Sequence, residues 1–403
     1  MKVLYATSAR VPGSKAHCSQ IAQMCRSFQN VGVDIELLRP GRARLAVYGS
    51  KTIKEWYGFE SEFPNQKLNC IDFLSGLPAG LPGPFYSLAF NTMVRTFNRS
   101  LLKYLKHYQG EYSLYTRDQL VFLKLAKAFP DVKKIMEFHH LEQKPVSTHN
   151  KESKIIFAAS GIVVLTSIMK EMLIARGYSE ERILVESSAV DPEAFPGTAL
   201  REESRKKLKL SGSGKIVSYI GNFHTLGLEK GLDTIVQSIP LVTQKHEDVS
   251  FYFVGGPMKY AENYISSLQE DGVDDRYYHF FDRQAYKDMH LWLAAADVLV
   301  MPLPDHPRFS NNCSPMKIFE YMTSGRPMVM SDLPAFRDVL KHEKNALLVS
   351  PGSAEEFSAA VLRLLEDPVL ATKLADNARN DVKEYSWDAR AKRIVKWIET
   401  LDE

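Results

Sequence analysis

The strongest constraint on the fold is an alternation of short, β-rich apolar runs with segments of helical spacing along nearly the whole chain. In the first half the runs expected to be strands are Lys2–Ala6, Asp34–Leu38, Tyr112–Tyr115, Lys134–Phe138, Gly161–Leu165 and Ile183–Glu186. The segments of helical spacing between them are Ser19–Gly32, Ser87–Tyr108, Leu120–Phe129 and Ile168–Gly177. Strands that alternate with helices in this way predict a parallel, doubly wound α/β sheet with helices on both faces.

The same alternation restarts after a break, so the chain is expected to hold two such sheets. The second set of expected elements is Ile216–Ile220, Gly231–Lys245, Ser250–Val254, Asn263–Glu270, Tyr278–Phe281, Tyr286–Ala295, Val298–Met301, Met316–Ser324 and Pro327–Met330. The break is Asp191-Pro-Glu-Ala-Phe-Pro-Gly with a charged run to Lys209, which is typical of a linker. A length of 403 residues also exceeds one usual domain. We therefore expect Rossmann-like domains at 1–192 and 193–385 that face each other across a ligand-binding cleft.

Composition indicates a globular protein and excludes several other classes. With 45% hydrophobic and 25% charged residues, neither long disorder nor a coiled-coil rod is expected. The net charge of +3 gives no argument for a nucleic-acid partner. Four widely separated cysteines form no Cys-x-x-Cys pair, which favours reduced thiols in a cytoplasmic protein. Met1–Thr7 lacks the apolar region of a signal peptide, and no stretch approaches the roughly 20 apolar residues of a membrane span.

The most informative stretch is Ser310–Pro334. A polar loop leads into Pro315, a preferred residue of the first helical turn, and Gly325 is placed to end the predicted helix. The exposed amides at such a helix start attract a diphosphate, and Lys317 adds a cation. Glu320, one turn further on, can accept hydrogen bonds from a ribose diol. A capped surface helix with incidental charges would show the same spacing, so the spacing alone leaves both interpretations open.

This run, Ser-Pro-Met-Lys-Ile-Phe-Glu-Tyr-Met-Thr-Ser-Gly-Arg-Pro followed by Ser-Asp-Leu-Pro, resembles the nucleotide-sugar-binding signature of family 4 glycosyltransferases, in the branch with a Ser-Pro-x-Lys-x-x-Glu-Tyr motif. Further matches follow the family's order: Glu137-Phe-His139, Ser188-Ala-Val-Asp191 with Phe195, Tyr219-Ile-Gly-Asn, Glu229-Lys-Gly231, Phe253-Val-Gly-Gly256 and Leu293-Ala-Ala-Ala-Asp-Val298. The resemblance covers essentially the whole chain. It implies a retaining transferase with the GT-B fold, in which residues 386–403 cross back onto the first domain.

The resemblance also implies a donor site in the second domain. Glu320 would bind the ribose of the donor. Lys230 would contact the diphosphate, and Lys317 with the loop amides of Ser314–Met316 would line the same site.

Two residues of this site depart from the family pattern. Asn312 stands where family members often carry a glutamate that touches the sugar, and Asn222 stands where an arginine often follows the strand-end glycine. Both remain among the expected donor-binding residues, and Lys230 becomes the principal cation expected from its side of the diphosphate.

Two residues of the first domain are assigned by the same resemblance. Gly13 lies in the loop where this domain would approach the donor, and His139 would point towards the transferred sugar. His139 thus joins Lys230 and Glu320 as an expected catalytic residue. Taken alone, a strand-end histidine beside His140 favours a satisfied polar residue at a domain edge, whereas the Glu-x-His match favours the donor contact.

The expected chemistry involves neither a metal nor a cofactor. Charge on the departing diphosphate can be stabilised by a helix N-terminus and lysines in place of a metal. No Asp-x-Asp pair is present, and Asp274-Asp275 lies in a Gly-Val-Asp-Asp turn that favours solvation. We expect a metal-independent, hexosyltransferase-type enzyme whose substrate is a UDP- or GDP-linked sugar. The resemblance implies attack by the acceptor on the face of the leaving diphosphate, which itself acts as the base.

One segment concerns the acceptor. Arg95, Arg99, Lys103 and Lys106 share one face of a predicted helix. A surface helix that packs its apolar side on the core explains this pattern, and the alternative is a basic patch near anionic lipid or a lipid-linked acceptor. The expected partners are a nucleotide sugar and a glycan or lipid-linked acceptor, with peripheral contact at the inner face of the membrane and no nucleic acid.

Other nucleotide-binding classes fit poorly. Ser211-Gly-Ser-Gly-Lys215 precedes a strand and has the wrong glycine spacing for a phosphate loop, and no G-x-G-x-x-G follows the first strand. By resemblance, the expected setting is the synthesis of surface polysaccharide or glycoconjugate in a bacterium. The alternatives are a catalytically inactive nucleotide-sugar-binding protein, which Asn222 and Asn312 favour, and a GT-B sugar-nucleotide epimerase.

Overall fold

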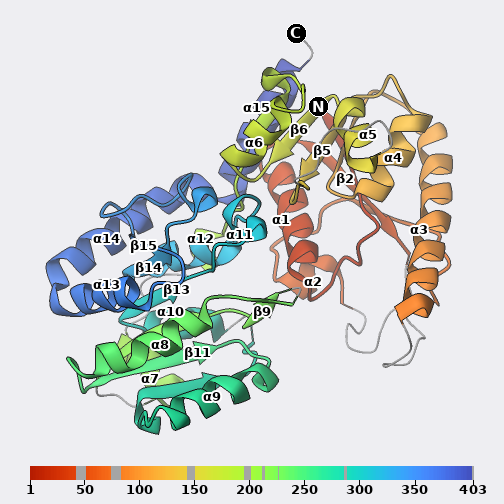
Figure 1. Cartoon of the computed structure of the whole chain (residues 1–403). Helices are drawn as coiled ribbons and strands as arrows, with labels where there is room; N and C mark the ends of the chain where they lie inside the picture. The colour runs from red at the N-terminus through yellow and green to blue at the C-terminus, as the bar shows by residue number, and fades with distance from the viewer. Residues whose placement is uncertain are drawn as a thin grey trace. The chain divides into compact units, whose positions relative to one another are not determined.

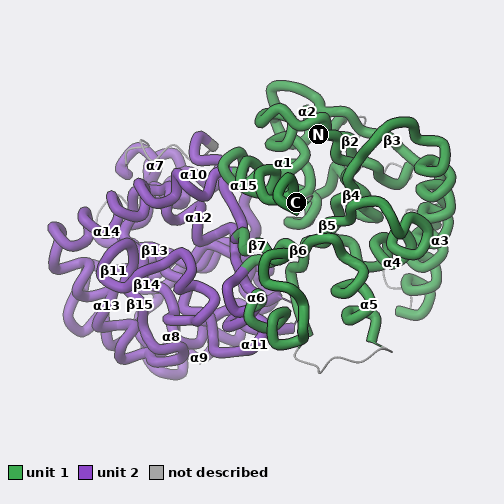
Figure 2. The backbone as a smooth tube through the Cα atoms, turned by 90° about the horizontal axis from the view of Figure 1, so that it is seen from above, with its two compact units in different colours: residues 1–165, 169–186, 387–403 green, residues 166–168, 187–386 purple. Residues whose placement is uncertain are grey.

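The computed structural model describes residues 1–41, 51–73, 83–142, 150–194, 201–210, 214–225, 227–285 and 288–401. These residues form two compact units, coloured separately in Figure 2. Unit 1 consists of Met1–Leu165, Met169–Glu186 and Trp387–Glu403, and unit 2 of Thr166–Ile168 and Ser187–Ser386. Phe195 and Tyr286, which the sequence placed in a motif and at a helix start, lie outside the described residues.

The units divide after residue 186, whereas the sequence placed the boundary after 192. A short excursion, Thr166–Ile168, also belongs to unit 2. Its hydrogen bonds explain this assignment. The Thr166 hydroxyl donates to the carbonyl oxygen of Asn311 at 2.7 Å, and the Ser167 amide and hydroxyl donate to the Asp338 carboxylate at 2.7 and 2.6 Å.

Unit 1 is built on a parallel sheet with strand order β3-β2-β1-β4-β5-β6-β7. The strands are β1 (Lys2–Ala6), β2 (Asp34–Pro40), β3 (Asn65–Leu68), β4 (Ser113–Thr116), β5 (Lys134–Phe138), β6 (Gly161–Val164) and β7 (Ile183–Val185). The edge strand β3 was not predicted, because Asn-Gln-Lys-Leu shows no apolar alternation. The order reverses between β1 and β4, and this reversal is the switch point of a doubly wound sheet.

Helices cover both faces of this sheet (Figure 1). They are α1 (Ala16–Asn30), α2 (Ile53–Tyr57), α3 (Gly83–Lys106), α4 (Gln119–Ala128), α5 (Lys151–Ala158), α6 (Ser167–Ile174) and α15 (Trp387–Thr400), with a 3-10 turn at Glu180–Arg182. Successive residues of β1 face opposite layers, as the pleat requires. Leu4 and Ala6 pack in a cluster with residues of α3 and α4, whereas the ring of Tyr5 lies tilted against that of Tyr115, which contacts Phe28 of α1.

Unit 2 repeats this plan with a parallel sheet of order β12-β11-β8-β13-β14-β15. Its strands are β8 (Lys215–Ile220), β11 (Val249–Val254), β12 (Tyr278–Phe281), β13 (Val298–Met301), β14 (Met328–Ser331) and β15 (Leu347–Val349), and β9 (His224–Thr225) pairs separately with β10 (Leu228–Glu229). The two sheets confirm the prediction of two doubly wound, Rossmann-like halves. In unit 2 the switch point lies between β8 and β13.

The helices of unit 2 are α7 (Arg201–Lys207), α8 (Leu232–Thr243), α9 (Ala261–Glu270), α10 (Met289–Ala295), α11 (Pro307–Ser310), α12 (Met316–Thr323), α13 (Ala354–Glu366) and α14 (Pro368–Asp381). Its 3-10 turns are Pro192–Ala194, Met258–Tyr260, Asp275–Tyr277, Pro334–Phe336 and Val382–Tyr385. The charged run predicted as linker forms α7, whose buried Arg205 pairs with Asp297 at 2.6 Å. It is therefore a packed helix, which its polar composition concealed.

The helix α15 follows unit 2 in sequence but belongs to unit 1. It packs along α1, beside which Figure 2 shows it. Its buried face consists of Trp387, Arg390, Ala391, Ile394 and Ile398. No helix among the described residues combines the length and apolar character that a membrane crossing requires.

Candidate functional site

The candidate site lies at the carboxyl edge of the sheet of unit 2, where β8 and β13 diverge. At the end of β8 the amide of Ile220 donates to the hydroxyl oxygen of Tyr321 at 2.8 Å, and that hydroxyl donates to the Ile220 carbonyl oxygen at 3.1 Å. Tyr321 is fully buried in α12. The pairing of β8 with β13 ends at Ser218 and Leu299. Beyond that point, the Tyr321 hydroxyl forms the hydrogen bonds with the backbone of β8. The start of α12 is thereby fixed at the switch point, where open α/β sheets bind ligands.

The N-terminus of α12 presents uncapped amides together with a cation. The capping position is Pro315, which supplies no side-chain hydrogen bond to the first turn. In the first turn the amide of Ile318 donates to the Pro315 carbonyl oxygen at 3.0 Å, and the amides of Met316 and Lys317 before it lie at the positive end of the helix. In the same turn Lys317 donates to the Glu320 carboxylate at 2.5 Å; the Glu320 side chain is 7% exposed and that of Lys317 is 25% exposed. The two residues that the sequence assigned to diphosphate and ribose are thus adjacent.

Lys230 is held against the same edge by its neighbour Gly231. Gly231 has a φ of +88° at the N-cap of α8, and a Cβ there would lie 1.9 Å from the carbonyl oxygen of Pro302, just after β13. Only glycine fits this approach. Burial lowers the pKa of the Lys230 ammonium, and the positive charge of Lys317 lowers it further, while Cys313 and Glu229 act in the opposite direction. In the part of the chain that the structure describes, Lys230 has no hydrogen-bond or ion-pair partner.

The loop before α12 is fixed by hydrogen bonds within unit 2. The Ser314 hydroxyl oxygen accepts from the Ser188 amide at 2.9 Å, so its side chain holds the loop. Asn312 is buried, and its amide donates to the carbonyl oxygen of Pro307 at 3.4 Å. Asn222, which follows β8, is exposed, and its carbonyl oxygen accepts from Tyr219 at 2.8 Å. The predicted donor-binding residues of unit 2 therefore gather at one sheet edge, and their roles remain predictions.

His139 in unit 1 is tied to a buried ionic network. Its Nε2 lies 2.7 Å from Glu137, which also accepts from Arg390 at 3.0 Å and from the Tyr115 hydroxyl. Burial and the Arg117 cation lower the pKa of His139 to about 4, against the opposing effect of Glu137. The ring is therefore neutral at pH 7. Nε2–H donates to the carboxylate, which leaves Nδ1 as an acceptor. This satisfied arrangement fits the interpretation that the residues alone favoured, and nothing in unit 1 tests the sugar contact.

Gly13 serves the packing of its own loop. A Cβ at this position would lie 2.6 Å from the Arg10 carbonyl oxygen and 3.0 Å from the sulfur of Cys18. Its amide donates to the Tyr57 hydroxyl at 3.0 Å, and that hydroxyl donates to its carbonyl oxygen at 2.9 Å. Because Tyr57 engages both backbone groups, the local structure accounts for this glycine without a ligand.

Sequence analysis missed Arg117, which follows β4 at the switch point of unit 1. It donates to the Gln20 side chain, and its charge lowers the pKa of both His17 and His139. Its position after an apolar strand was the only available signal, because the side chains it influences come from distant segments.

The described residues contain no group of three or more His, Cys, Asp or Glu side chains that could hold a metal ion. In the acidic pair named above, Asp274 accepts from the Arg276 amide at 3.0 Å and therefore stabilises a turn. The candidate site in unit 2 instead gathers cations and amides, which suit an anion.

Comparison with known proteins connects this geometry with a family. Residues 214–367 match the model of the glycosyl transferases group 1 family. An uncharacterized glycosyltransferase of Methanocaldococcus jannaschii is 26% identical over 241 residues, which cover 58% of each chain. A D-inositol 3-phosphate glycosyltransferase of Corynebacterium urealyticum is 24% identical over 268 residues, 64% of this chain and 61% of that protein. The chain thus spans about three fifths of the length of these two relatives.

Solved structures of similar fold extend over the whole chain. Sucrose-phosphate synthase from Thermosynechococcus elongatus has a TM-score of 0.73 at 17% identity and covers 100% of this chain and 99% of its own. HepE of Anabaena in complex with UDP has a TM-score of 0.74 at 15% identity, with 99% and 100% covered. Residues 214–367 are therefore similar to the glycosyl transferases group 1 family, and the two parallel-sheet units have the fold of GT-B glycosyltransferases.

Proposed function

We propose that this protein is a retaining glycosyltransferase that moves a hexose from a UDP- or GDP-linked donor to a glycan or lipid-linked acceptor. The observation that carries the proposal is the combination of Lys230, Lys317 and the uncapped start of α12 with Glu320 one turn later. An anion at that helix start would meet two cations and the positive end of the helix dipole. The group 1 match over residues 214–367 supports the same assignment.

The proposed chemistry depends on stabilising the departing nucleoside diphosphate. Lys230 and Lys317 neutralise charge as the glycosidic phosphate bond breaks, and the α12 amides donate to the phosphate oxygens. The acceptor hydroxyl attacks from the same face and passes its proton to the leaving phosphate, so the configuration at the anomeric carbon is retained. A half-buried Lys230 without a carboxylate partner suits this task, and we propose that the reaction requires no metal.

The setting we propose is cytoplasmic assembly of surface polysaccharide or glycoconjugate, with peripheral contact at the inner face of the membrane. Four exposed cations, Arg95, Arg99, Lys103 and Lys106, follow one stripe of α3. Phe85 and Leu88 continue this stripe towards the start of the helix and are 57% and 65% exposed. No acidic residue occurs within α3. Cations beside exposed apolar side chains suit a surface of anionic lipid.

The proposed donor site is tested by comparing how the parent and Glu320→Ala bind a ribonucleotide and its 2′-deoxyribonucleotide. We expect the parent protein to bind UDP or GDP about tenfold to a hundredfold more tightly than the 2′-deoxy counterpart, because a carboxylate accepts the ribose hydroxyl bond. In Glu320→Ala the ratio of the affinities for the ribonucleotide and the deoxyribonucleotide is expected to fall towards one. Isothermal titration with each ribo and deoxy pair measures it, and Glu366→Ala, an exposed glutamate on α13, is the matched control.

A ribose preference that stays the same in Glu320→Ala removes this carboxylate from the donor site. Activity is followed in parallel, by mass spectrometry of mixed nucleotide sugars supplied with and without acceptor. Binding of a donor without its consumption would support an inactive binding protein, and isomerised donor formed without acceptor would support an epimerase.

A further inference from the structure

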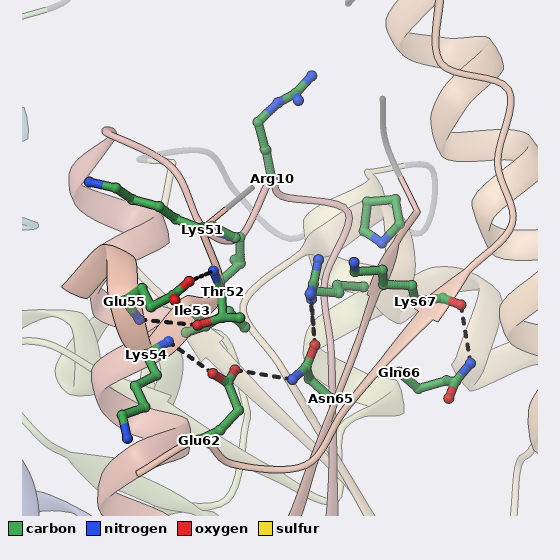
Figure 3. A pocket seen from close by; sticks show the side chains of 14 residues that line it. Arg10, Lys51, Thr52, Ile53, Lys54, Glu55, Glu62, Asn65, Gln66 and Lys67 are labelled. Carbon is green, nitrogen blue, oxygen red and sulfur yellow. Dashed lines mark hydrogen bonds between the residues drawn. The ribbon is translucent and has the colours of Figure 1, made fainter. Parts of the chain in front are cut away.

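Unit 1 contains a pocket of about 850 Å³ at the carboxyl edge of its sheet. Its walls are the loop after β1, the end of β2, the strand β3 and the segment that begins α2 (Figure 3). We infer that this pocket binds a phosphate group of the acceptor. The inference rests on the proposed function, because it assigns the acceptor to unit 1, and it deepens that function by naming the chemical class of the acceptor.

The charge of the pocket is predominantly positive. Five lining side chains are cationic, namely Arg10, Arg39, Lys51, Lys54 and Lys67, whereas two are acidic, Glu55 and Glu62. These cations come from four separate segments of the chain, so the fold gathers them and no single run of the sequence displays them. Figure 3 shows Lys51 and Lys67 on opposite sides of the pocket.

The two carboxylates of the lining are engaged with neighbouring backbone and amide groups. Glu55 accepts from the Thr52 amide at 2.7 Å in a capping box at the start of α2. Glu62 accepts from the Lys54 amide at 3.0 Å and from the Asn65 side chain at 3.3 Å. Both residues therefore shape the wall, and the dashed lines of Figure 3 mark these bonds.

Arg39 is positioned to provide directional hydrogen bonding. Its Nε and Nη2 both donate to the Oδ1 of Asn65, at 3.1 and 2.7 Å, so a neutral amide holds the planar guanidinium in place. Arg10 is held by a carboxylate outside the lining, with its Nη2 3.4 Å from Asp72. A guanidinium fixed in this way matches phosphate geometry, and surrounding lysines add point charges.

A phosphate suits this pocket better than a neutral sugar or a single carboxylate. A phosphate monoester carries a charge of about −1.5 to −2 at pH 7 and three acceptor oxygens, and it can therefore engage several of the cations at once. A neutral glycan offers no such charge. The source of the phosphate is either a soluble sugar or polyol phosphate or the headgroup of a phospholipid.

The experiment titrates the full chain with sn-glycerol 3-phosphate, with glycerol as the neutral probe, at constant ionic strength set by chloride. The variants are Lys67→Gln, at an exposed pocket lysine, and Arg39→Gln, with Arg39→Lys as the conservative replacement. Lys124→Gln with Lys127→Gln, exposed on α4 of the same unit, is the matched control. Binding is measured by calorimetry, and thermal melting shows that each variant is folded.

We expect glycerol 3-phosphate to bind the parent and the α4 control equally, and glycerol to bind neither. We expect Arg39→Gln to bind glycerol 3-phosphate at least tenfold more weakly than the parent does. The loss of affinity should be smaller in Arg39→Lys and in Lys67→Gln. Equal binding of glycerol 3-phosphate to parent and pocket variants overturns the inference, as does a parent that binds none.

Vesicles distinguish the two sources of the phosphate. Vesicles that contain phosphatidic acid, whose headgroup is a phosphate monoester, are compared with phosphatidylcholine vesicles. If the headgroup is the ligand, the pocket variants should bind the phosphatidic acid vesicles less tightly than the parent does. A loss confined to glycerol 3-phosphate identifies a soluble acceptor. Donor titration of the same variants keeps the two proposals separate. If Glu320→Ala loses its preference for ribose as expected, but the pocket variants bind glycerol 3-phosphate as tightly as the parent does, the pocket alone is refuted. If the pocket variants lose phosphate binding, but Glu320→Ala keeps the ribose preference, the donor site alone is refuted.

Discussion

Lys230 carries a charge that the described part of unit 2 does not neutralise. Its neighbours include a second cation, Lys317, and burial of the ammonium adds a desolvation cost. Such a position lowers the stability of the free protein, and an anion bound beside Lys230, as we propose, would compensate its charge. The stability and the binding function of this residue should therefore change in opposite directions.

Replacing Lys230 by methionine tests this opposition. We expect Lys230→Met to weaken binding of UDP or GDP by tenfold or more while the affinity for the matching monophosphate changes less than about twofold, because only the outer phosphate loses its cation. The same change should raise the free energy of unfolding by about 1 kcal/mol, since it removes an uncompensated charge that is half-buried and partly desolvated. Calorimetric titration and urea denaturation measure the two effects.

Lys245→Met, at an exposed lysine that follows α8, serves as the control for Lys230→Met. It should leave diphosphate binding and stability unchanged. Equal losses for mono- and diphosphate in Lys230→Met would place the lysine away from the outer phosphate.

At the scale of elements, the candidate site of unit 2 depends on a turn that closely approaches the residue after a strand. Gly231 begins α8 with its α-carbon facing the Pro302 carbonyl group, and this contact sets the distance between Lys230 and the end of β13. Tyr321 anchors α12 to β8 on the other side. The position of each cation is therefore set by backbone contacts of neighbouring elements.

Alanine at position 231 should disturb both the fold and the site. We expect Gly231→Ala to cost about 2–4 kcal/mol, because a left-handed conformation is strained for alanine and its Cβ collides with the Pro302 carbonyl oxygen. Gly272→Ala is the control: its φ is +71° and nothing lies within 4 Å of the added Cβ, so about 1 kcal/mol of strain is expected. Chemical denaturation compares them, and equal costs would contradict a role for the contact with Pro302.

An element can be predicted from the sequence when nearby residues mark its ends or give it an apolar pattern. The α12 helix was predicted because Pro315 and Gly325 delimit it, and the strand–helix alternation predicted both sheets. The strand β3 and helix α7 were missed, because their polar residues resemble a loop and a linker.

The side-chain clusters of unit 1 were missed for a different reason. Arg117 acts on histidines from other segments, and the pocket cations Arg39 and Lys67 come from separate strands. Only the parallel pairing of β2 with β3 brings the latter two together, where Arg39 and Lys67 are direct partners in the register. No spacing along the chain reveals such a pair.

At the scale of the whole molecule, unit 1 depends on an ion pair between segments that are 253 residues apart. Arg390 of α15 is completely buried and donates to Glu137 of β5 at 3.0 Å. The Arg390 guanidinium and the hydrogen bond from His139 hold the pKa of Glu137 well below its usual range, although burial acts to raise it. Each charge is thus stable in the interior only while the other is present.

A double-mutant cycle measures this dependence. We expect Glu137→Gln to destabilise the protein by about 3–5 kcal/mol, since it leaves the buried Arg390 charge without its carboxylate. The double variant with Arg390→Met should recover much of this loss, because no uncompensated charge remains. Urea denaturation followed by fluorescence provides the four free energies. If the change in the free energy of unfolding of the double variant equals the sum of the changes in the two single variants, the two charges do not stabilise each other.

The return of α15 to unit 1 also bears on biosynthesis. Translation supplies residues 1–186 first, yet the segment Trp387–Glu403 that completes their fold leaves the ribosome only after all of unit 2. Until then the nascent unit 1 lacks the helix that covers α1 and the cation that pairs with Glu137. Unit 2, apart from Thr166–Ile168, is continuous in sequence and can close earlier. Domains usually complete their folding in the order of synthesis, from the N-terminus, and here that order is reversed. We therefore expect unit 1 to remain incompletely folded for longer during translation than unit 2, and to depend on a chaperone for longer.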